Sequence, residues 1–571
     1  MKVFINAHII SPTVELPAGA DAIAIKDGII SAIGKSAELS TGATEIIDLK
    51  GAVLLPGFVD PHAHPLMYGQ MMDWVDVGPS KAKNITQIIE ILKREEAALP
   101  AGVPLRAFGY EHRNLEEGRH PTKEDIDQIS TTREIYVMNA SGHGGAVNTL
   151  VLEKSAITAK TPDPKGGAFE RDASGNPTGV IWDAACDILT GDAGVKVTNH
   201  GPNFHLPDTQ SVLTKQFLQA QHEFIRHGVT SVGDAQVSQR EFDTYKDAKK
   251  NGALKVRYSM YLISSQVGHA KKLSTDAAID NTMLTANGIK MYADGTLGGW
   301  TAYFPEGYKA DKNRTGQLYH DAQEFESIFL DCATQGYHIA THAQSPTAIG
   351  MVISSARAMR NKEIKSVNGA FPIVRIEHCG LPQEKQSHEL HDLEIIAVNQ
   401  PIHHHNWGDG VVTAVGNEIG ERFNPLGEFV KNGVSFALSS DAPVGKPNPF
   451  EAMAAAMDRL TVHGTELGAN DLKIDARTAL IAHTMGGAKA LGKADLIGSI
   501  EVGKYADFAV VDANPLAAGP AAMRAITVLA TYLGGQRSFY SPRRPATRGG
   551  ERNVPSIQAN SQAILYGFHY M

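Results

Sequence analysis

Sulfur ligands and long apolar runs are both scarce in this sequence. The 571 residues include three cysteines, Cys186, Cys332 and Cys379, and no two of them form a CxxC pair. That spacing argues against a disulfide framework, a thiol redox motif and a thiolate zinc site. No run of about 18 apolar residues occurs, so we predict no membrane-spanning segment. The first residues lack the apolar core of a signal peptide, and we expect a cytoplasmic protein.

Positively charged residues are outnumbered by negatively charged ones. Lysine and arginine number 53 against 62 aspartates and glutamates, a formal net charge of −9. Dedicated nucleic-acid-binding proteins usually carry a basic domain, so this class is disfavoured. Charged residues make up 20% and hydrophobic residues 42% of the chain, as in ordinary globular proteins. Histidine, in contrast, is abundant at 23 residues, so imidazole and carboxylate are the expected ligands of any bound metal.

Short β-branched runs gather at the two ends of the chain. The N-terminal runs are KVFINAHIIS, AIAIKDGIISAIG and TEIIDLKGAVLLPG, and the C-terminal runs are GSIEVGKYADFAVVD and AITVLATYLGG. Turn residues separate them, which is typical of short strands. We predict one small β-sandwich assembled from both termini, residues 1–56 and residues 496–571, the second part ending in a tail.

Between these flanks, apolar runs alternate with helical patterns. The predicted strands are Leu54–Val59, Thr230–Val232, Val256–Ile263, Gly288–Tyr292, His338–Thr341, Ile373–Ile376, Ile395–Val398 and Val434–Leu438. Eight strands with intervening helices predict an α/β fold, a parallel (β/α)8 TIM-like barrel over residues 57–495. The long separation of the first two strands predicts a large insertion at about residues 67–205, which we expect to be a lid or substrate-binding subdomain.

Ligand-type side chains follow several of these strands. His62 and His64 in LLPGFVDPHAHP lie on one face of an extended segment, where two neutral imidazoles can chelate one metal. Two unrelated surface histidines would show the same spacing. Four later strands end near further candidates, which are Lys290, His342, His378 and Asp441. Each has a structural interpretation alone, but all five strand ends meet at the mouth of such a barrel, which favours a metal site.

The order HxH, Lys, His, His, Asp resembles the amidohydrolase superfamily of metal-dependent hydrolases. The phrases GVTSVGDA, IKMYADGTLGG, IEHCG and LSSDAPV resemble amidohydrolase family 3, the branch that contains N-substituted formamide deformylase. The resemblance implies hydrolysis of a non-peptide carbon–nitrogen bond in an amide, formamide or N-acyl compound. The alternatives are an esterase or lactonase, a cyclic-amide hydrolase, a metal-dependent isomerase or lyase, and a non-catalytic member that lost its metal.

The resemblance also implies a binuclear centre. His62 and His64 would hold one cation with Asp441, and His342 and His378 would hold the other. Lys290 would bridge them after N6-carboxylation, because a free ammonium has no lone pair to offer. Two zinc ions per chain are expected, with iron, manganese, nickel or cobalt as alternatives, and a single cation beside unmodified Lys290 stays open. Metal-activated hydroxide would attack the carbonyl, with Asp441 as general base and then acid.

Substrate contacts are expected from the insertion and from the loop after the lysine strand. The candidates are His143, Asn148, Asp294 and Trp300, although His143 could equally be a structural loop histidine. Three consecutive histidines, His403 to His405, follow the seventh strand and are interpreted as pocket wall or surface. The expected partner is a small amide, with no nucleic acid and no membrane, and the resemblance leaves room for a homodimer.

Overall fold

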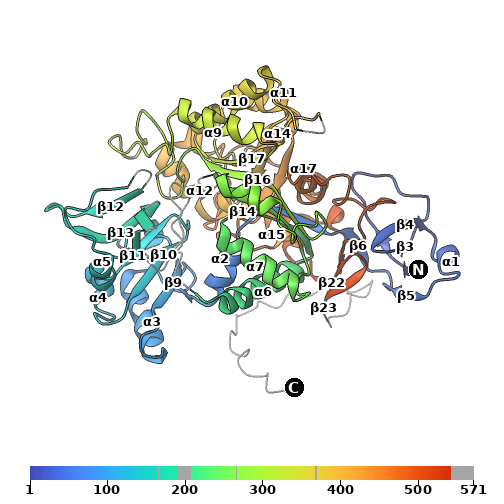
Figure 1. Ribbon diagram of the computed structural model, residues 1–571, viewed down its shortest axis with the longest axis horizontal. Coiled ribbons are helices and arrows are strands. Elements are labelled where there is room, and N and C mark those ends of the chain that lie inside the picture. Colours follow the sequence, from blue (N-terminus) through green and yellow to red (C-terminus); the bar gives the residue numbers. More distant parts are fainter. Residues whose placement is uncertain are drawn as a thin grey trace.

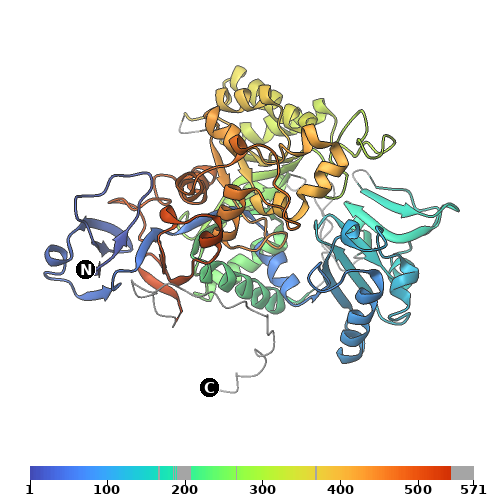
Figure 2. The same cartoon turned by 180° about the vertical axis from the view of Figure 1, so that it is seen from behind.

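The computed structural model describes residues 1–541 apart from 165–166, 184, 187, 190–207, 265–266 and 367–368. The predicted C-terminal tail and part of the predicted insertion therefore lie outside the described residues. Figures 1 and 2 show a central helical and stranded body, with a sheet-rich lobe at each end of the long axis. No helix in the described part of the chain is long and apolar enough to cross a membrane.

The central body contains the predicted barrel. Its sheet has eight strands, and every neighbouring pair is parallel. In spatial order they are β7 (Phe58–Ala63), β14 (Val229–Val237), β15 (Arg257–Ile263), β16 (Leu284–Tyr292), β17 (His338–Ala343), β18 (Val374–His378), β19 (Ile396–Asn399) and β20 (Phe436–Leu438). Helices that follow these strands include α7 (Gln239–Lys250), α9 (Ala322–Thr334), α10 (Pro346–Asn361), α11 (Glu384–Asp392), α12 (Pro401–Val415) and α15 (Pro449–Asp458). The (β/α)8 prediction is confirmed.

The first predicted strand proves to be two strands of different sheets. β6 (Val53–Pro56) pairs with the C-terminal part of the chain, and β7 starts the barrel after Gly57. A Cβ atom on Gly57 would lie 2.1 Å from Thr230 Oγ1 on the neighbouring strand β14. Only glycine allows this close approach of the two strands. Gly57 therefore lets the chain pass directly from the sheet of β6 into the barrel.

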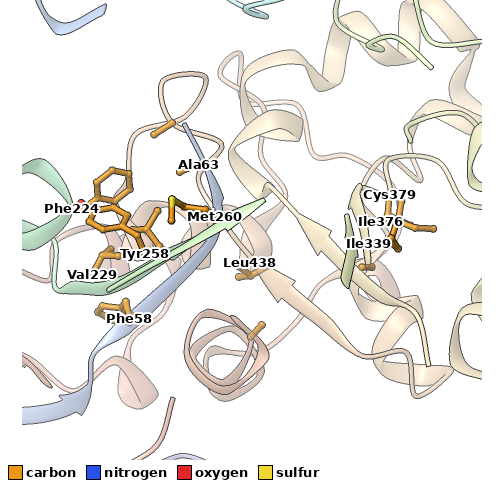
Figure 3. Close-up of a cluster of buried hydrophobic side chains, with 14 of the residues drawn as sticks. Phe58, Ala63, Phe224, Val229, Tyr258, Met260, Ile339, Ile376, Cys379 and Leu438 are labelled. Carbon is orange, nitrogen blue, oxygen red and sulfur yellow. The ribbon is translucent and has the colours of Figure 1, made fainter. Parts of the chain in front are cut away.

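Apolar side chains on the outer face of the barrel pack against its helices. Phe58, Val229, Tyr258 and Met260, from neighbouring strands, belong to one buried cluster with Phe224 of helix α6 (Gln210–Arg226) (Figure 3). Because strand residues alternate between two faces, the intervening residues point into the barrel. Those interior positions include the charged and aromatic residues considered below.

The insertion is a sheet of its own. Its six strands run in the order β12 (Gly167–Arg171), β13 (Pro177–Asp183), β11 (Gly144–Val147), β10 (Ile135–Asn139), β9 (Leu105–Tyr110) and β8 (Val75–Asp76). The helices α3 (Ile85–Ala98), α4 (Lys123–Asp127) and α5 (Thr149–Lys154) lie between these strands in the sequence. Figures 1 and 2 place this lobe at the opposite end of the barrel from the chain's N-terminal sheets.

The second lobe combines the two ends of the described chain. One sheet has the order β2 (His8–Ile9), β6, β21 (Phe508–Val511), β22 (Val528–Leu533) and β23 (Gln536–Tyr540), and the other has β4 (Ile29–Gly34), β3 (Ala22–Lys26), β1 (Lys2–Ile5) and β5 (Glu45–Asp48). Phe4 packs edge-on against Phe508 and Tyr532, with ring centroids 5.6 and 4.7 Å apart. The predicted β-sandwich from both termini is therefore confirmed.

A buried ion pair joins this sandwich to the amino-terminal end of the barrel. Arg257, the first residue of β15, contacts Asp507 through Nε–Oδ2 at 2.7 Å and Nη2–Oδ1 at 3.1 Å. Both side chains are buried, and the guanidinium lies 3.8 Å from the ring centroid of Tyr505. Asp507 Oδ1 also accepts the backbone N–H of Gly534. We call this the basal ion pair.

Candidate metal centre

The six predicted ligands meet at the carboxyl ends of the barrel strands. His62, Lys290, His342 and His378 lie at or near the ends of β7, β16, β17 and β18, while His64 and Asp441 lie just beyond β7 and β20. All six line one cavity of about 30 Å³. Its other lining residues are Met67, Ser141, Gly142, His143, Gln236, Tyr292 and Val444.

Two histidines contact the same carboxylate oxygen. Asp441 Oδ1 lies 3.3 Å from His62 Nε2 and 3.2 Å from His64 Nε2. These ligand atoms lie within 4.8 Å of one another, and the Asp441 backbone N–H donates to the His62 carbonyl at 2.9 Å. Two imidazoles and a carboxylate are ligands that suit a divalent transition metal, so the donor set fits a cation.

His342 and His378 lie beside this triad. Their ring centroids are 4.5 Å apart, and the His378 ring is 5.0 Å from that of His62. His342 Nε2 lies 2.9 Å from the Gly295 carbonyl, and His378 Nδ1 lies 2.7 Å from Gln400 Oε1. Each contact uses one ring nitrogen as donor, so the other nitrogen of each ring is the one that could coordinate a cation.

Only one of the three consecutive histidines faces the centre. His403 Nε2 lies 3.5 Å from Asp441 Oδ2 and is buried. His404 Nε2 instead bonds the Ala455 carbonyl at 2.9 Å, and His405 Nδ1 bonds the Leu460 carbonyl at 2.6 Å. Asp441, His378 and His403 form a second group of closely spaced ligand-type atoms.

Burial keeps most of these imidazoles neutral, which is the form that binds cations. It lowers the pKa of His64 to about 4 and holds the pKa of His342 and of His378 far below the usual value. His62 is the exception, because Glu377 and Asp441 raise its pKa against the effect of burial. For Asp441, burial favours the neutral acid, but His62 and the hydrogen bond from His64 outweigh it and hold the pKa of the carboxyl well below its usual range.

Lys290 is a buried lysine in an unusual setting. Its Nζ lies 4.7 Å from the Tyr292 ring centroid, and it makes no hydrogen bond or ion pair with any residue that the structure describes. Burial lowers the pKa of Lys290 to about 8. A larger share of neutral amine, the nucleophile that carboxylation needs, is therefore present than for an exposed lysine.

A carboxylate that the sequence analysis missed supports His62 from behind. Glu377 Oε2 contacts His62 Nδ1, and both side chains are buried. Burial alone would raise the pKa of Glu377, but Arg375 and His62 outweigh it and lower that pKa to about 2. Asp234 was missed too, and lies on the corresponding side of His64, with Oδ1 4.0 Å from Nδ1.

The insertion contributes His143 to the same cavity. The His143 ring lies 5.4 Å from that of His342, and its Nδ1 lies 2.9 Å from Asp183 Oδ1. Asp183 also accepts hydrogen bonds from Tyr319 and Gln317 of the loop after β16, both at 2.9 Å. The histidine is therefore held by groups from the insertion and from the barrel.

Asn148, a predicted substrate contact, forms hydrogen bonds within the insertion. Its Oδ1 accepts the backbone N–H of Val151 and caps helix α5. Its Nδ2 donates to the carbonyls of Ser130 and Arg133 at 3.0 and 2.8 Å. The buried amide is thus committed to the insertion's own fold, and it is not among the described residues that line the cavity.

Asp294 and Trp300 also lie outside the described cavity lining. Asp294 is buried and accepts backbone N–H groups of Tyr303, Gln344 and Ser345, so it links the loops that follow β16 and β17. Trp300 stacks on Tyr308 with ring centroids 5.5 Å apart and planes 15° apart. Both residues shape the loop after β16, and their expected substrate contacts stay predictions.

Comparisons with known proteins bear on the fold and the family of this chain. A family model described as "Amidohydrolase family" matches residues 45–539. N-substituted formamide deformylase of Arthrobacter pascens is 25% identical over 526 residues, covering 90% of this chain and 94% of that protein. Putative amidohydrolase YtcJ of Bacillus subtilis is 25% identical over 90% of this chain and 95% of its own length. An uncharacterized metal-dependent hydrolase from Pyrococcus horikoshii has the same fold, with a TM-score of 0.71 at 23% identity over 91% of this chain and 99% of that one.

Proposed function

The chain belongs to the amidohydrolase family, enzymes that act on carbon–nitrogen bonds other than peptide bonds, and we propose that its substrate is a small linear amide, formamide or N-acyl amine. The observation that carries this proposal is the convergence of His62, His64 and Asp441 with Lys290, His342 and His378 around one buried cavity. One of the similar proteins is named N-substituted formamide deformylase, which favours a formyl group over a bulkier acyl group. N-formyl amines are therefore the first substrates to test.

Two divalent cations complete the proposed site. His62, His64 and Asp441 would hold one cation, His342 and His378 would hold the other, and N6-carboxylated Lys290 would supply oxygen ligands to both. Neutral imidazoles with carboxylates suit zinc, and iron, manganese, nickel and cobalt accept the same ligands. When bound, such cations lower the pKa of water and polarise a carbonyl group.

Asp441 moves the proton in this proposal. Its Oδ1 lies against His62 and His64, so Oδ2 is the atom that accepts a proton from the attacking water. The same oxygen then donates that proton to the amine nitrogen as the carbon–nitrogen bond breaks, leaving a carboxylic acid and a free amine.

His143 binds the substrate from the side of the insertion. Asp183 fixes its Nδ1, so Nε2 is the atom that contacts the amide group. Because the loop 141–143 lines the cavity together with barrel residues, the insertion acts as part of the substrate site.

The test combines metal analysis with a substrate panel. Purified protein is loaded with Zn²⁺ in the presence of bicarbonate, and the release of amine from N-formyl, N-acetyl and longer N-acyl amines is measured. We expect the shortest acyl groups to react fastest, and His62→Ala and His342→Ala to abolish the activity. Wild-type turnover in either variant, or no amine release by protein that holds two metals per chain, would contradict the proposal.

A further inference from the structure

A charged pair lies inside the barrel, where branched apolar residues usually fill the space. Arg375 and Glu377 occupy alternate positions of β18, and both side chains are fully buried. Arg375 Nε lies 2.6 Å from Glu377 Oε1, and Nη2 lies 3.2 Å from Oε2. We call this the interior ion pair.

Arg375 is anchored on several sides. Its Nη2 donates to the Pro61 carbonyl at 2.8 Å, one residue before His62, and its Nη1 donates to the Ala490 carbonyl at 3.3 Å. The guanidinium also lies 4.0 Å from the ring centroid of Tyr261. These contacts fix the guanidinium, and with it the Glu377 carboxylate.

Stability alone gives a poor account of this arrangement. Removing two charges from water is costly, and well-packed apolar residues in place of a buried ion pair are often as stable or more so. What distinguishes this pair is the third partner, since Glu377 Oε2 also contacts His62 Nδ1.

We propose that Glu377 is a positioning residue of the metal centre, that it sets the tautomer and orientation of His62, and that Arg375 holds it in place. This inference rests on the proposed function, because it concerns the same cation site. A carboxylate can only accept a hydrogen bond, so His62 Nδ1 must carry the ring proton. Nε2 would then present its lone pair beside His64 Nε2 and Asp441 Oδ1, where a cation would bind.

Glutamine in place of Glu377 would no longer select one tautomer of His62. Glutamine can accept a hydrogen bond from Nδ1–H, but it can also donate to an unprotonated Nδ1 and so favour the tautomer whose Nε2 carries the proton. That tautomer cannot ligate a metal through Nε2. Partners of this kind behind metal-binding histidines typically contribute about 10- to 100-fold to metal affinity or activity.

The experiment measures metal affinity rather than turnover. Zn²⁺ binding to full-length wild type and Glu377→Gln is measured by competition with a chelator, and the visible absorption of the Co²⁺-substituted proteins is recorded. We expect about 10- to 100-fold weaker Zn²⁺ binding in Glu377→Gln and an altered Co²⁺ spectrum. Affinity within twofold of wild type in the folded variant would overturn the inference.

Two further variants keep the result interpretable. Asp507→Asn disrupts the basal ion pair, which is also buried but lies away from the metal-site residues, and we expect its Zn²⁺ affinity to equal that of wild type. If Glu377→Gln fails to fold, Arg375→Gln combined with Glu377→Gln removes both charges together, and the same weaker binding is expected. Wild-type protein that binds no divalent cation would instead refute the proposed function, so the two failures are distinguishable.

Discussion

Two buried arginine–carboxylate pairs lie at different places in the barrel and differ in what else they touch. The basal pair, Arg257–Asp507, bonds to the backbone of the sandwich, whereas the interior pair, Arg375–Glu377, contacts His62. Side chains at the amino-terminal face of such barrels serve stability, and those at the carboxyl-terminal face serve chemistry. The comparison teaches that a buried arginine–carboxylate pair can either join two domains or position a candidate metal-binding histidine. Which of the two it does depends on the third group that it contacts.

The largest effect on catalysis without loss of stability is expected at the carboxyl-terminal face of the barrel, from Asp441→Asn. Asparagine retains the shape of the side chain but cannot accept and return a proton, so kcat should fall by about 10²–10⁴-fold. KM should change far less, and the free energy of unfolding of the metal-free protein should not decrease. Steady-state kinetics and urea unfolding check both statements. Turnover within tenfold of wild type would contradict the role assigned to Asp441.

At the amino-terminal end of the barrel, Asp507→Asn should lower the free energy of unfolding and leave kcat unchanged. Removing one partner of a buried pair leaves an uncompensated charge, and the cost is about 3–5 kcal/mol of unfolding free energy. The kcat of the folded fraction should equal that of wild type. Arg257→Met combined with Asp507→Leu removes both charges and should regain much of the loss. A reduced kcat with an unchanged free energy of unfolding in Asp507→Asn would contradict the structural role assigned to the basal ion pair.

Two buried lysines allow the same comparison between the metal site and the amino-terminal end of the barrel. Burial lowers the pKa of both Lys290 and Lys493 to about 8, but Lys493 bonds Thr285 Oγ1 near the start of β16. A lysine with this pKa is about 10% neutral at pH 7 and about 90% neutral at pH 9. Carboxylation consumes CO2 as well as neutral amine, so the comparison is made at one fixed concentration of dissolved CO2, where carboxylation of Lys290, and with it metal loading, should be faster at pH 9 than at pH 7.

The lysine variants supply the control for that experiment. Lys290→Ala should lose metal that short carboxylic acids partly restore, because they can replace the bridging carbamate. Lys493→Ala should load metal like wild type. Metal content is measured by elemental analysis after each treatment. Equal metal loading by Lys290→Ala and wild type would contradict the carbamate.

The smallest effect is expected in the insertion, from Asn148→Ala. Loss of the cap on helix α5 should cost about 0.5–2 kcal/mol of stability. Because the amide bonds only within the insertion's own fold, kcat and KM should not change. His143→Ala, five residues earlier, is the matched variant and should raise KM. A change in KM for Asn148→Ala would instead indicate the substrate contact that the sequence predicts.

The sequence located the barrel because parallel strands buried on both faces are short, continuous apolar runs. It joined β6 to β7 because only Gly57 separates two apolar strands there, and composition does not reveal that they belong to different sheets. Strand ends identified the six candidate ligands, since each carries a ligand-type side chain after an apolar run.

The supporting residues were harder to predict. Glu377 directly precedes His378, and nothing in the local pattern indicates that it lies behind His62 from the other end of the chain. The same limitation applies to Asp183 and His143, which come together only when β13 pairs with β11. Asn148 carried a usable signal that was given too little weight, because an asparagine before a helical pattern is a typical N-cap.

The sheet that joins both ends of the described chain has a consequence for biosynthesis. Strands β2 and β6 pair with each other and leave the ribosome early, but β21, the other partner of β6, follows more than four hundred residues later. During most of translation the edge of β6 that pairs with β21 therefore has no native partner, and unpaired edges of this kind are prone to aggregation. Closure of this sheet is a late event, and a chaperone that shields the nascent amino-terminal segment would raise the yield of folded protein.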